Sequence, residues 1–442
     1  MKTVFCALLT LAAAQAQTPS AIANFGNSPR DPGVRGGAPS AGSALSGLTT
    51  GQLSYFQNGQ TAFSETIYVN NAPPGSDNGL GPRFNSNSCI SCHAFPAVGG
   101  SSPPVNPQIA AATAMGARNH VPSFLSPTGP VREVRFKTKP DGTPDGGVHG
   151  LFVISGRSDA QGCSIQQEDF SNASNLSFRI PTPTFGAGLI EAIRDSTLRG
   201  NLAANAALKA ALGITGKLNT SGNDGTITRF GWKAQNKSLE IFSGEAYNVE
   251  SGVTNRLFPQ ERDETPGCQY NALPEDNINF NTGESDDLIL FSSFMSFLAP
   301  PARGPMTNSV NNGASVFKTT GCVLCHTPSL QTGQSNVASL NQQTANLYSD
   351  LAVHGMGPGL ADSIQQGAAA GDEFRTAPLW GLGQRLFFLH DGRTSDLLQA
   401  IRAHASDGNN QFPASEANGV IRRFIQLSNS DTQDLLNFLR SL

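Results

Sequence analysis

The chain has 442 residues, with 29 lysines and arginines against 33 aspartates and glutamates, so its formal net charge is −4. A weakly acidic balance and a charged fraction of 14% give no basis for binding nucleic acid or an anionic membrane surface. This length predicts about two to three domains, and the 47 glycines and 28 prolines predict many ordered loops.

The first 16 residues, MKTVFCALLTLAAAQA, have the features of a secretory signal peptide. An early Lys2 is followed by a short apolar run and a small-residue ending. The run is shorter than the roughly 20 apolar residues that a membrane span needs. We therefore expect cleavage before Gln17, loss of Cys6 with the signal, and a periplasmic mature protein without a membrane anchor.

The motif Cys-x-x-Cys-His occurs twice, in NSCISCHAF and in GCVLCHTPS. A bare Cys-x-x-Cys is also found in redox dithiols and zinc sites, but a histidine directly after the second cysteine indicates covalent c-type haem attachment. Two thioether bonds hold the porphyrin edge, and the adjacent imidazole reaches the iron. Zinc would need a second ligand pair close to each motif. The sequence therefore predicts two covalent c-type haems, attached at Cys89, Cys92, Cys322 and Cys325, with His93 and His326 as iron ligands.

Two further cysteines, Cys163 and Cys268, remain in the mature chain. In an oxidising compartment two such cysteines most often pair, so we expect a disulfide between them. The alternative is a catalytic dithiol that oxidises thiols, although neither cysteine belongs to a Cys-x-x-Cys pair.

A short helical segment precedes each haem motif. QNGQTAF carries Gly59 and Phe63 four residues apart, and NNGASVFKTTGC carries Gly313 and Phe317 at the same spacing. Residues four apart share one helix face, so the glycine can approach another helix while the aromatic ring fills the core.

A second amphipathic segment ends each of the two units. SDDLILFSSFMSFL spans residues 285–298, and SDTQDLLNFLRSL follows a Ser/Asp cap at the end of the chain. The repetition of both segments indicates an internal duplication. We expect a mainly α fold with two cytochrome c-like haem domains.

The domain boundaries follow from this repetition. The proline-rich APPARGP at 299–305 is a stiff linker between an N-terminal domain, 17–298, and a C-terminal domain, 306–442. The first domain is the longer one, and VREVRFKT, KPDGTPDGG and VHGLFVISG in succession predict a β-hairpin insertion within it.

Three segments together resemble a known family: GLGPRFNSNSCISCHAFPAVGG, FGWKAQNKSLEIFSGEAYNVESGVTN and EFRTAPLWGLGQRLFFLHDGRTSDLLQAIRAH. They are similar to the di-haem oxidoreductases described as peroxidase-type or thiol oxidoreductase-like proteins, from about residue 50 to the end of the chain. The last segment is more distantly similar to bacterial di-haem cytochrome c peroxidases. The resemblance implies peroxide chemistry at one haem and electron entry at the other.

His404 is the foremost candidate for a distal iron ligand. In TSDLLQAIRAH, a helix capped by Thr394 or Ser395 places His404 on the same face as two apolar residues. It stands at the place where the resembling peroxidases carry the distal ligand of their second haem. Met356, in a glycine-rich loop, is the alternative, and its thioether would raise the haem potential relative to bis-histidine ligation.

The other histidines have less specific expectations. His390, in FFLHDGR, could hydrogen-bond a haem propionate or water with Arg393 as its charged partner, or could only cap the next helix. We expect His120 and His149 to be surface or satisfied core residues.

The resemblance also implies residues for the first haem. Glu250 corresponds to the carboxylate that the peroxidases place above their active haem, and Glu245 is a nearby alternative. The glutamine that those enzymes carry upstream is not evident here. Trp232 aligns with the aromatic residue between the haems, with Trp380 as its alternative.

Thr376 and Pro378 match a Thr-x-Pro whose backbone oxygens help to hold an interdomain calcium ion in the same peroxidases. Calcium is therefore a further expected cofactor.

The sequence thus predicts a periplasmic di-haem oxidoreductase of the cytochrome c peroxidase type. It would reduce peroxide, or another small oxidant, at the first haem. Electrons from a small donor such as a c-type cytochrome would enter through the second haem. The alternative is a non-catalytic electron-transfer cytochrome in which both irons have two strong ligands.

Overall fold

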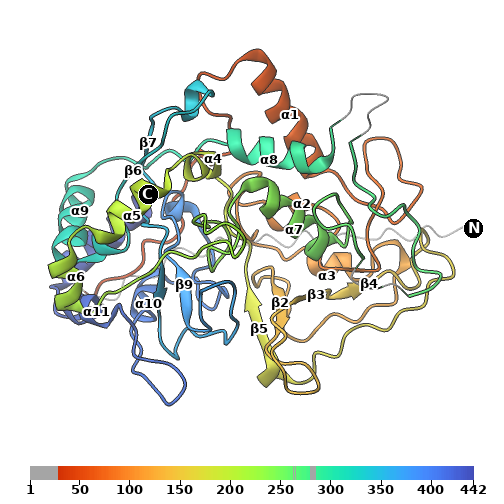
Figure 1. Cartoon of the computed structure of the whole chain (residues 1–442). Helices are drawn as coiled ribbons and strands as arrows, with labels where there is room; N and C mark the ends of the chain where they lie inside the picture. The colour runs from red at the N-terminus through yellow and green to blue at the C-terminus, as the bar shows by residue number, and fades with distance from the viewer. Residues whose placement is uncertain (1–27, 262, 264, 279–284) are drawn as a thin grey trace, which may run out of the picture.

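The computed structural model describes residues 28–261, 263, 265–278 and 285–442. The predicted signal peptide, with Cys6, lies outside these residues. The described part of the chain is rich in helices and has only short strands (Figure 1). None of its helices is long and apolar enough to cross a bilayer.

The α-helices are α1 Thr50–Ser64, α2 Cys89–Cys92, α3 Gln108–Ala111, α4 Ala187–Glu191, α5 Asp195–Ala203, α6 Ala206–Leu212, α7 Leu239–Ser251, α8 Asp287–Phe297, α9 Asn308–Thr320, α10 Leu397–Arg402, α11 Asn418–Ile425 and α12 Asn429–Ser441. The strands are β1 Arg83–Phe84, β2 Glu133–Phe136, β3 Val148–His149, β4 Phe152–Val153, β5 Leu176–Arg179, β6 Leu330–Gln331, β7 Thr344–Ala345, β8 Val353–Gly355 and β9 Glu373–Arg375.

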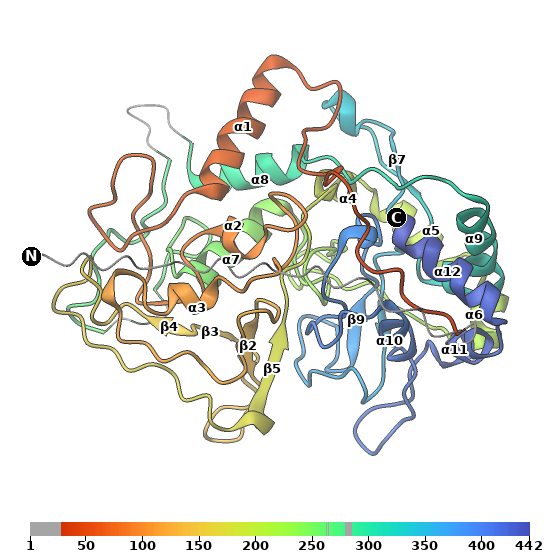
Figure 2. The same cartoon turned by 180° about the vertical axis from the view of Figure 1, so that it is seen from behind.

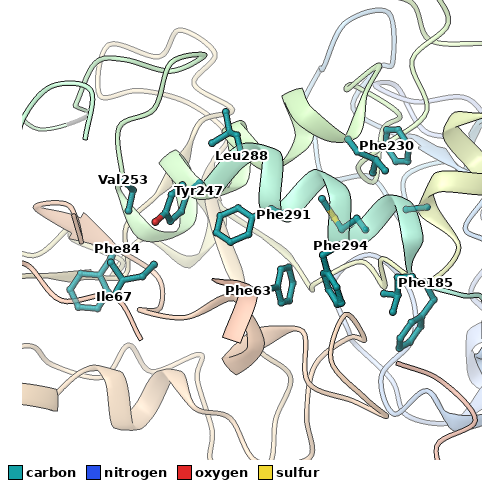
Figure 3. Packing of buried hydrophobic residues seen from close by; sticks show 14 of the residues in the cluster. Phe63, Ile67, Phe84, Phe185, Phe230, Tyr247, Val253, Leu288, Phe291 and Phe294 are labelled. Atoms are coloured by element: carbon teal, nitrogen blue, oxygen red, sulfur yellow. The ribbon is translucent and has the colours of Figure 1, made fainter. Parts of the chain in front are cut away.

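Helices α1 and α8 form the first helix pair, and Gly59 lies at their contact. A Cβ atom on Gly59 would lie 2.1 Å from the Leu290 carbonyl oxygen, so the backbones approach more closely than any larger residue allows. Phe63, one turn later, packs on Phe294 with ring centroids 5.0 Å apart. Figure 3 shows Phe63 beside Phe294, and Phe291 lies about one turn earlier in α8.

Helices α9 and α12 repeat this arrangement in the later half. A Cβ atom on Gly313 would lie 1.9 Å from the Asp434 carbonyl oxygen. Phe317 packs on Phe438 with ring centroids 5.3 Å apart. The expected role of both glycines is confirmed, and each helix pair has the same glycine approach and phenylalanine contact. Helix α12 begins at the cap Ser428, two residues before the predicted segment.

The predicted hairpin forms, but its second strand divides. Strands β2 and β3 pair antiparallel, with Val134 opposite His149, and β5 lies on the other edge of β2. Residues 152–153 leave this sheet and pair as β4 with β1. Gly150 allows the change of partner, because a Cβ there would lie 2.7 Å from the Arg83 Cβ. That the hairpin is an insertion stays a prediction.

Segments of the two halves of the chain interlace, as Figure 2 shows for the red segment before α1. Asp31 in that segment accepts hydrogen bonds from Arg440 of α12 at 2.6 and 2.7 Å. A Cβ on Gly419 of α11 would lie 2.3 Å from the Leu212 carbonyl oxygen at the end of α6. The division into domains at 299–305 stays a prediction.

Cys163 and Cys268 are joined by a disulfide bond, as expected. Both residues are buried, which agrees with a structural bridge and not with an exposed dithiol.

Candidate haem sites

Two cavities contain the haem motifs, and the larger of them, about 220 Å³, has the second motif in its wall. Cys322, Cys325 and His326 line it from the turn after α9. The His326 amide donates to the Cys322 carbonyl at 2.9 Å, so one turn of chain brings the motif together.

The smaller cavity, about 150 Å³, has the first motif in its wall. Cys89, Cys92 and His93 line it from α2 and the residue after it. The His93 amide donates to the Cys89 carbonyl at 3.0 Å, as in the other motif. Each motif therefore presents both thiols and its imidazole to a separate cavity.

Both motif histidines are held in the same way. Nδ1 of His326 lies 3.0 Å from the Tyr348 carbonyl oxygen, and Nδ1 of His93 lies 3.0 Å from that of Gly100. A ring that donates from Nδ1 to a carbonyl presents Nε2 to a metal. Burial lowers the pKa of each imidazole to about 4, so both rings are neutral at pH 7, which is the form that binds iron.

Three of the four motif thiols favour the protonated form, which is a poor nucleophile. Burial raises the pKa of Cys89, Cys92 and Cys322 to about 12. A redox dithiol needs a lowered thiol pKa, so these environments fit attachment cysteines better than a dithiol that exchanges with substrates.

His404 lies in the wall of the larger cavity, as the helix face of Leu397 and Ile401 predicts. Its Nδ1 lies 2.8 Å from the Ala400 carbonyl oxygen, the same arrangement as in the motif histidines. His404 is close enough to His326 for a charge on one ring to lower the pKa of the other. The predicted cap is wrong, because Asp396 caps α10 and accepts from the Gln399 amide.

Met356 lines the same cavity, where it packs with Trp232 and Phe374. It is therefore still the alternative ligand, although its packing also gives it a structural role.

Of His390 and Arg393, only His390 lies in the wall of a haem-motif cavity. His390 lines the larger cavity, stacks on Phe374 with ring centroids 4.2 Å apart, and has its pKa lowered to about 4 by burial. Arg393 is exposed, bonds Asp391 and the Gly359 carbonyl, and is not in the wall of either cavity. Arg393 is nevertheless close enough to influence the pKa of His390, and a shared role of the two at a propionate stays a prediction.

Two arginines that the sequence analysis did not consider line the larger cavity, where Arg393 does not. Arg375 and Arg385 are buried in the wall of the larger cavity, and burial lowers the pKa of each to about 10. Nε and Nη2 of Arg385 have no hydrogen-bond partner among the described residues. A buried guanidinium with N–H groups that lack partners, as in Arg385, fits the carboxylates of a haem, whereas Arg375 already donates from Nε to the Gly231 carbonyl at 2.9 Å. Their position on either side of the Thr-x-Pro in an otherwise apolar segment was the only available sequence signal.

Trp232 is in the walls of both cavities. Its Nε1 donates to the Ile180 carbonyl at 2.8 Å, which fixes the indole plane. Trp380, its alternative, lines neither of these two cavities and packs in the core against Gly186.

Glu250 and Glu245, both from α7, line the smaller cavity. The Glu245 carboxylate accepts from the Asn236 amide. The Glu250 carboxyl is hydrogen-bonded to Glu133 of β2 and to Asn85. Glu133 has no counterpart in the sequence prediction.

Met295 is a thioether that the sequence analysis did not consider, and it also lines the smaller cavity. It follows Phe294, as Leu439 follows Phe438, so it corresponds to an aliphatic residue of the larger cavity. Met295 lies on the helix that packs against Phe63, which contacts His93. Leu439 lies on the helix that packs against Phe317, which contacts His326.

His354 is a further residue of the larger cavity with an unexpected setting. Its ring bridges the carboxylates of Asp350 and Glu416 at 3.0 and 2.9 Å. Cys325, Asp350 and His354 also form the one compact set of possible metal ligands among the described residues. Because Cys325 belongs to the haem motif, this set needs no ion to explain it.

The remaining predicted residues have surroundings that do not indicate a role as an iron ligand or a proton donor. His149 lies between Asp145 and Glu168 at 3.3 and 3.4 Å, and His120 is exposed. The Thr376 carbonyl accepts from the Ser349 hydroxyl at 2.5 Å, so it already has a hydrogen-bond partner. Calcium stays a prediction.

The fold and the two cavities define a protein with paired cofactor sites. A model of the family described as "Di-haem oxidoreductase, putative peroxidase" matches residues 151–442. This match covers more than half of the chain, and the chain belongs to that family. The neutral motif imidazoles and the partnerless guanidinium of Arg385 fit the haem groups that the family implies.

No curated protein matches the chain. Among solved structures, hydrazine synthase from Kuenenia stuttgartiensis is 13% identical, covers 98% of this chain and 100% of its own, and has a TM-score of 0.34. The diheme peroxidase BthA from Burkholderia thailandensis is 14% identical over 48% of this chain and 65% of its own, with a TM-score of 0.31. A MauG-like protein associated with microbial copper homeostasis is 16% identical over 59% and 90%, with a TM-score of 0.30. The family assignment rests on the family model and not on these low scores.

Proposed function

We propose that this family member carries one covalent c-type haem in each cavity and reduces peroxide at the first haem with electrons that enter through the second. The observation that supports this most is the difference between the cavity walls. The larger cavity offers His404 besides His326. The smaller cavity offers carboxyl groups and arginines besides His93.

The haems would supply the site of peroxide reduction and the electrons for it. Glu250 is the residue of this chain that moves a proton. Peroxide cleavage needs a group near the cavity that transfers a proton between the two oxygens. Burial and the neighbouring charge of Glu133 raise the pKa of Glu250 well above its usual value, which favours the protonated carboxyl that a proton donor needs.

Trp232 is placed to connect the two sites. It is in both cavity walls, and its indole is fixed by the bond to Ile180. An aromatic ring between the cavities shortens the path for electrons from the second site to the first.

The setting of the enzyme is the periplasm, because residues 1–16 have the features of a signal peptide. The electron donor is a small reduced protein such as a c-type cytochrome. The substrate is peroxide or another small oxidant, which fits a cavity wall that offers a carboxyl group as proton donor.

The purified holoprotein tests this proposal. After denaturing electrophoresis, haem staining should follow the chain. The ferric electron paramagnetic resonance spectrum should show one low-spin iron and one high-spin or weakly ligated iron. In His404→Ala the low-spin signal should be replaced by a high-spin one. His149→Ala is the control, because His149 lines neither cavity.

Two outcomes contradict the proposal. A denatured chain free of haem would exclude covalent attachment. Two low-spin signals in the resting protein, with no high-spin form after one-electron reduction, would support the electron-transfer cytochrome instead.

A further inference from the structure

Two carboxyl groups from separate elements meet in the wall of the smaller cavity. Glu133 comes from β2, and Glu250 comes from the last turn of α7. The side chains are hydrogen-bonded to each other, and both line the cavity. Two carboxylates in hydrogen-bond contact repel each other when both are ionised, so the contact favours a state in which one of the pair holds a proton.

The charges around the pair decide which carboxyl is ionised. Arg135 lies two residues after Glu133 on the same face of β2, and its Nε donates to the Glu133 carboxylate. Arg179, from the neighbouring strand β5, adds a second positive charge near Glu133. Both guanidinium groups therefore favour the ionised form of Glu133.

Arg179 is fixed in place from its other side. Its Nη2 donates to Asp362 at 2.7 Å, and its Nη1 donates to Gln366 at 2.5 Å. Lys233 pairs with the second oxygen of Asp362 at 3.1 Å. All three charged groups are buried, so the positive charge of Arg179 cannot turn away into solvent.

The groups that face Glu250 have the opposite effect. Glu133 repels its negative charge, while Asn85 is a neutral hydrogen-bond partner. The Cys92 thiol also lines the cavity, and the charge of Glu250 disfavours its thiolate form. Glu245, on the same helix, faces Arg135 and competes for its charge. Arg135 is the only cation among the main influences on Glu250, and it acts more weakly than Glu133.

We propose that Glu133 is a positioning residue that accepts a hydrogen bond from the Glu250 carboxyl and so keeps a transferable proton at the wall of the smaller cavity. This inference rests on the proposed function and deepens it. The pKa of Glu133 is lowered by Arg135 and Arg179 against the effect of its burial, and that of Glu250 is raised. The two directions agree with the contacts.

The proton balance is then complete. Reduction of hydrogen peroxide to two waters breaks the O–O bond and consumes two electrons and two protons. The reduced donor protein supplies the electrons. Glu250 delivers one proton to the leaving oxygen, the second comes from solvent, and Glu250 is protonated again from solvent while Glu133 keeps its charge.

The test compares Glu133→Gln with Glu250→Gln in the resting holoprotein. Infrared difference spectra over a pH series should show a protonated carboxyl at pH 7 that is absent in Glu250→Gln. In Glu133→Gln the neighbouring negative charge is lost, so this carboxyl should ionise about 1 pH unit or more lower. The alkaline limb of the pH profile of peroxide turnover should shift by the same amount.

Two further variants exclude a merely structural effect. Glu133→Asp keeps the charge and should restore most of the original titration. Glu240→Gln changes a carboxylate of the same helix that pairs with Arg256 outside the cavity, and it should leave the infrared band unchanged.

The outcomes separate this inference from the proposed function. An unchanged titration in Glu133→Gln, in a protein that still reduces peroxide, overturns the role of Glu133 alone. The expected titration in a protein without peroxidase activity supports the carboxyl pair and refutes the proposed substrate.

Discussion

Glu416 in the wall of the larger cavity and Glu250 in the wall of the smaller one have pKa values that shift in opposite directions. In the larger cavity Glu416 accepts from His354 at 2.9 Å and from the amides of Thr215, Gly216 and Gly355 at 2.9 to 3.1 Å. These partners lower its pKa to about 2 against the effect of burial. In the smaller cavity burial and Glu133 raise the pKa of Glu250. The same type of side chain therefore favours its ionised form in one cavity and its protonated form in the other.

The difference shows how two similar helix pairs can support two cavities with different walls. The helix pairs and motif histidines of the two halves are nearly the same. The residues facing the motif histidines come from other elements. In the larger cavity α10 supplies the imidazole of His404, whereas in the smaller cavity β2 and α7 supply the carboxyl pair. We infer that the scaffold holds the cofactors and that these additional elements determine the chemistry.

The largest expected effect is that of Glu250→Gln, which removes the proton donor from one cavity only. Peroxide turnover should fall about 10²-fold or more, the usual scale for loss of a general acid. Both ferric spectra should stay nearly unchanged. Glu240→Gln should turn over peroxide like the wild type. Equal turnover in both variants would remove the catalytic role of Glu250 and with it the main difference between the cavities.

Local patterns predicted the features that the two halves share. The motifs, the glycine and phenylalanine of each helix pair, and the face that aims His404 inward all depend on spacings within one turn or one helix. Contacts between distant segments could not be predicted in this way. Glu133 meets Glu250 only because β2 is folded against α7, and Arg385 enters the larger cavity while Arg393 remains outside. Glu133 and Arg135, two residues apart in a predicted strand, indicated a charged face in the sequence. They did not indicate that Glu250 would be the residue in contact with that face.

A smaller effect tests whether the two helix pairs are equivalent. Gly59→Ala and Gly313→Ala each place a Cβ about 2 Å from a backbone carbonyl oxygen, at 2.1 and 1.9 Å. The helices must separate, and the free energy of unfolding should fall by about 1–3 kcal/mol in each variant. The control is Gly200→Ala in α5, where a Cβ meets nothing within 4 Å. That variant should gain up to about 1 kcal/mol. A loss in only one of the two helix pairs, measured by urea unfolding, would break the equivalence.

The smallest expected effect concerns the fixed charge of the larger cavity. Glu416→Gln keeps an oxygen that can accept from the Thr215 and Gly216 amides but loses the charge that pairs with His354. At pH 7 the free energy of unfolding should fall by about 1–2 kcal/mol, the scale of hydrogen bonds to a charged group.

The pH dependence of this loss identifies its cause. A carboxyl whose pKa is lowered by folding stabilises the protein above its unfolded value, and that contribution disappears as the pH falls toward its folded value. The pKa of Glu416 falls from 4.5 to about 2 on folding. The difference in unfolding free energy between wild type and variant should therefore be constant above about pH 5 and shrink below pH 4.5. A difference that stays constant down to pH 3 would show that packing around residue 416, and not its charge, stabilises this wall.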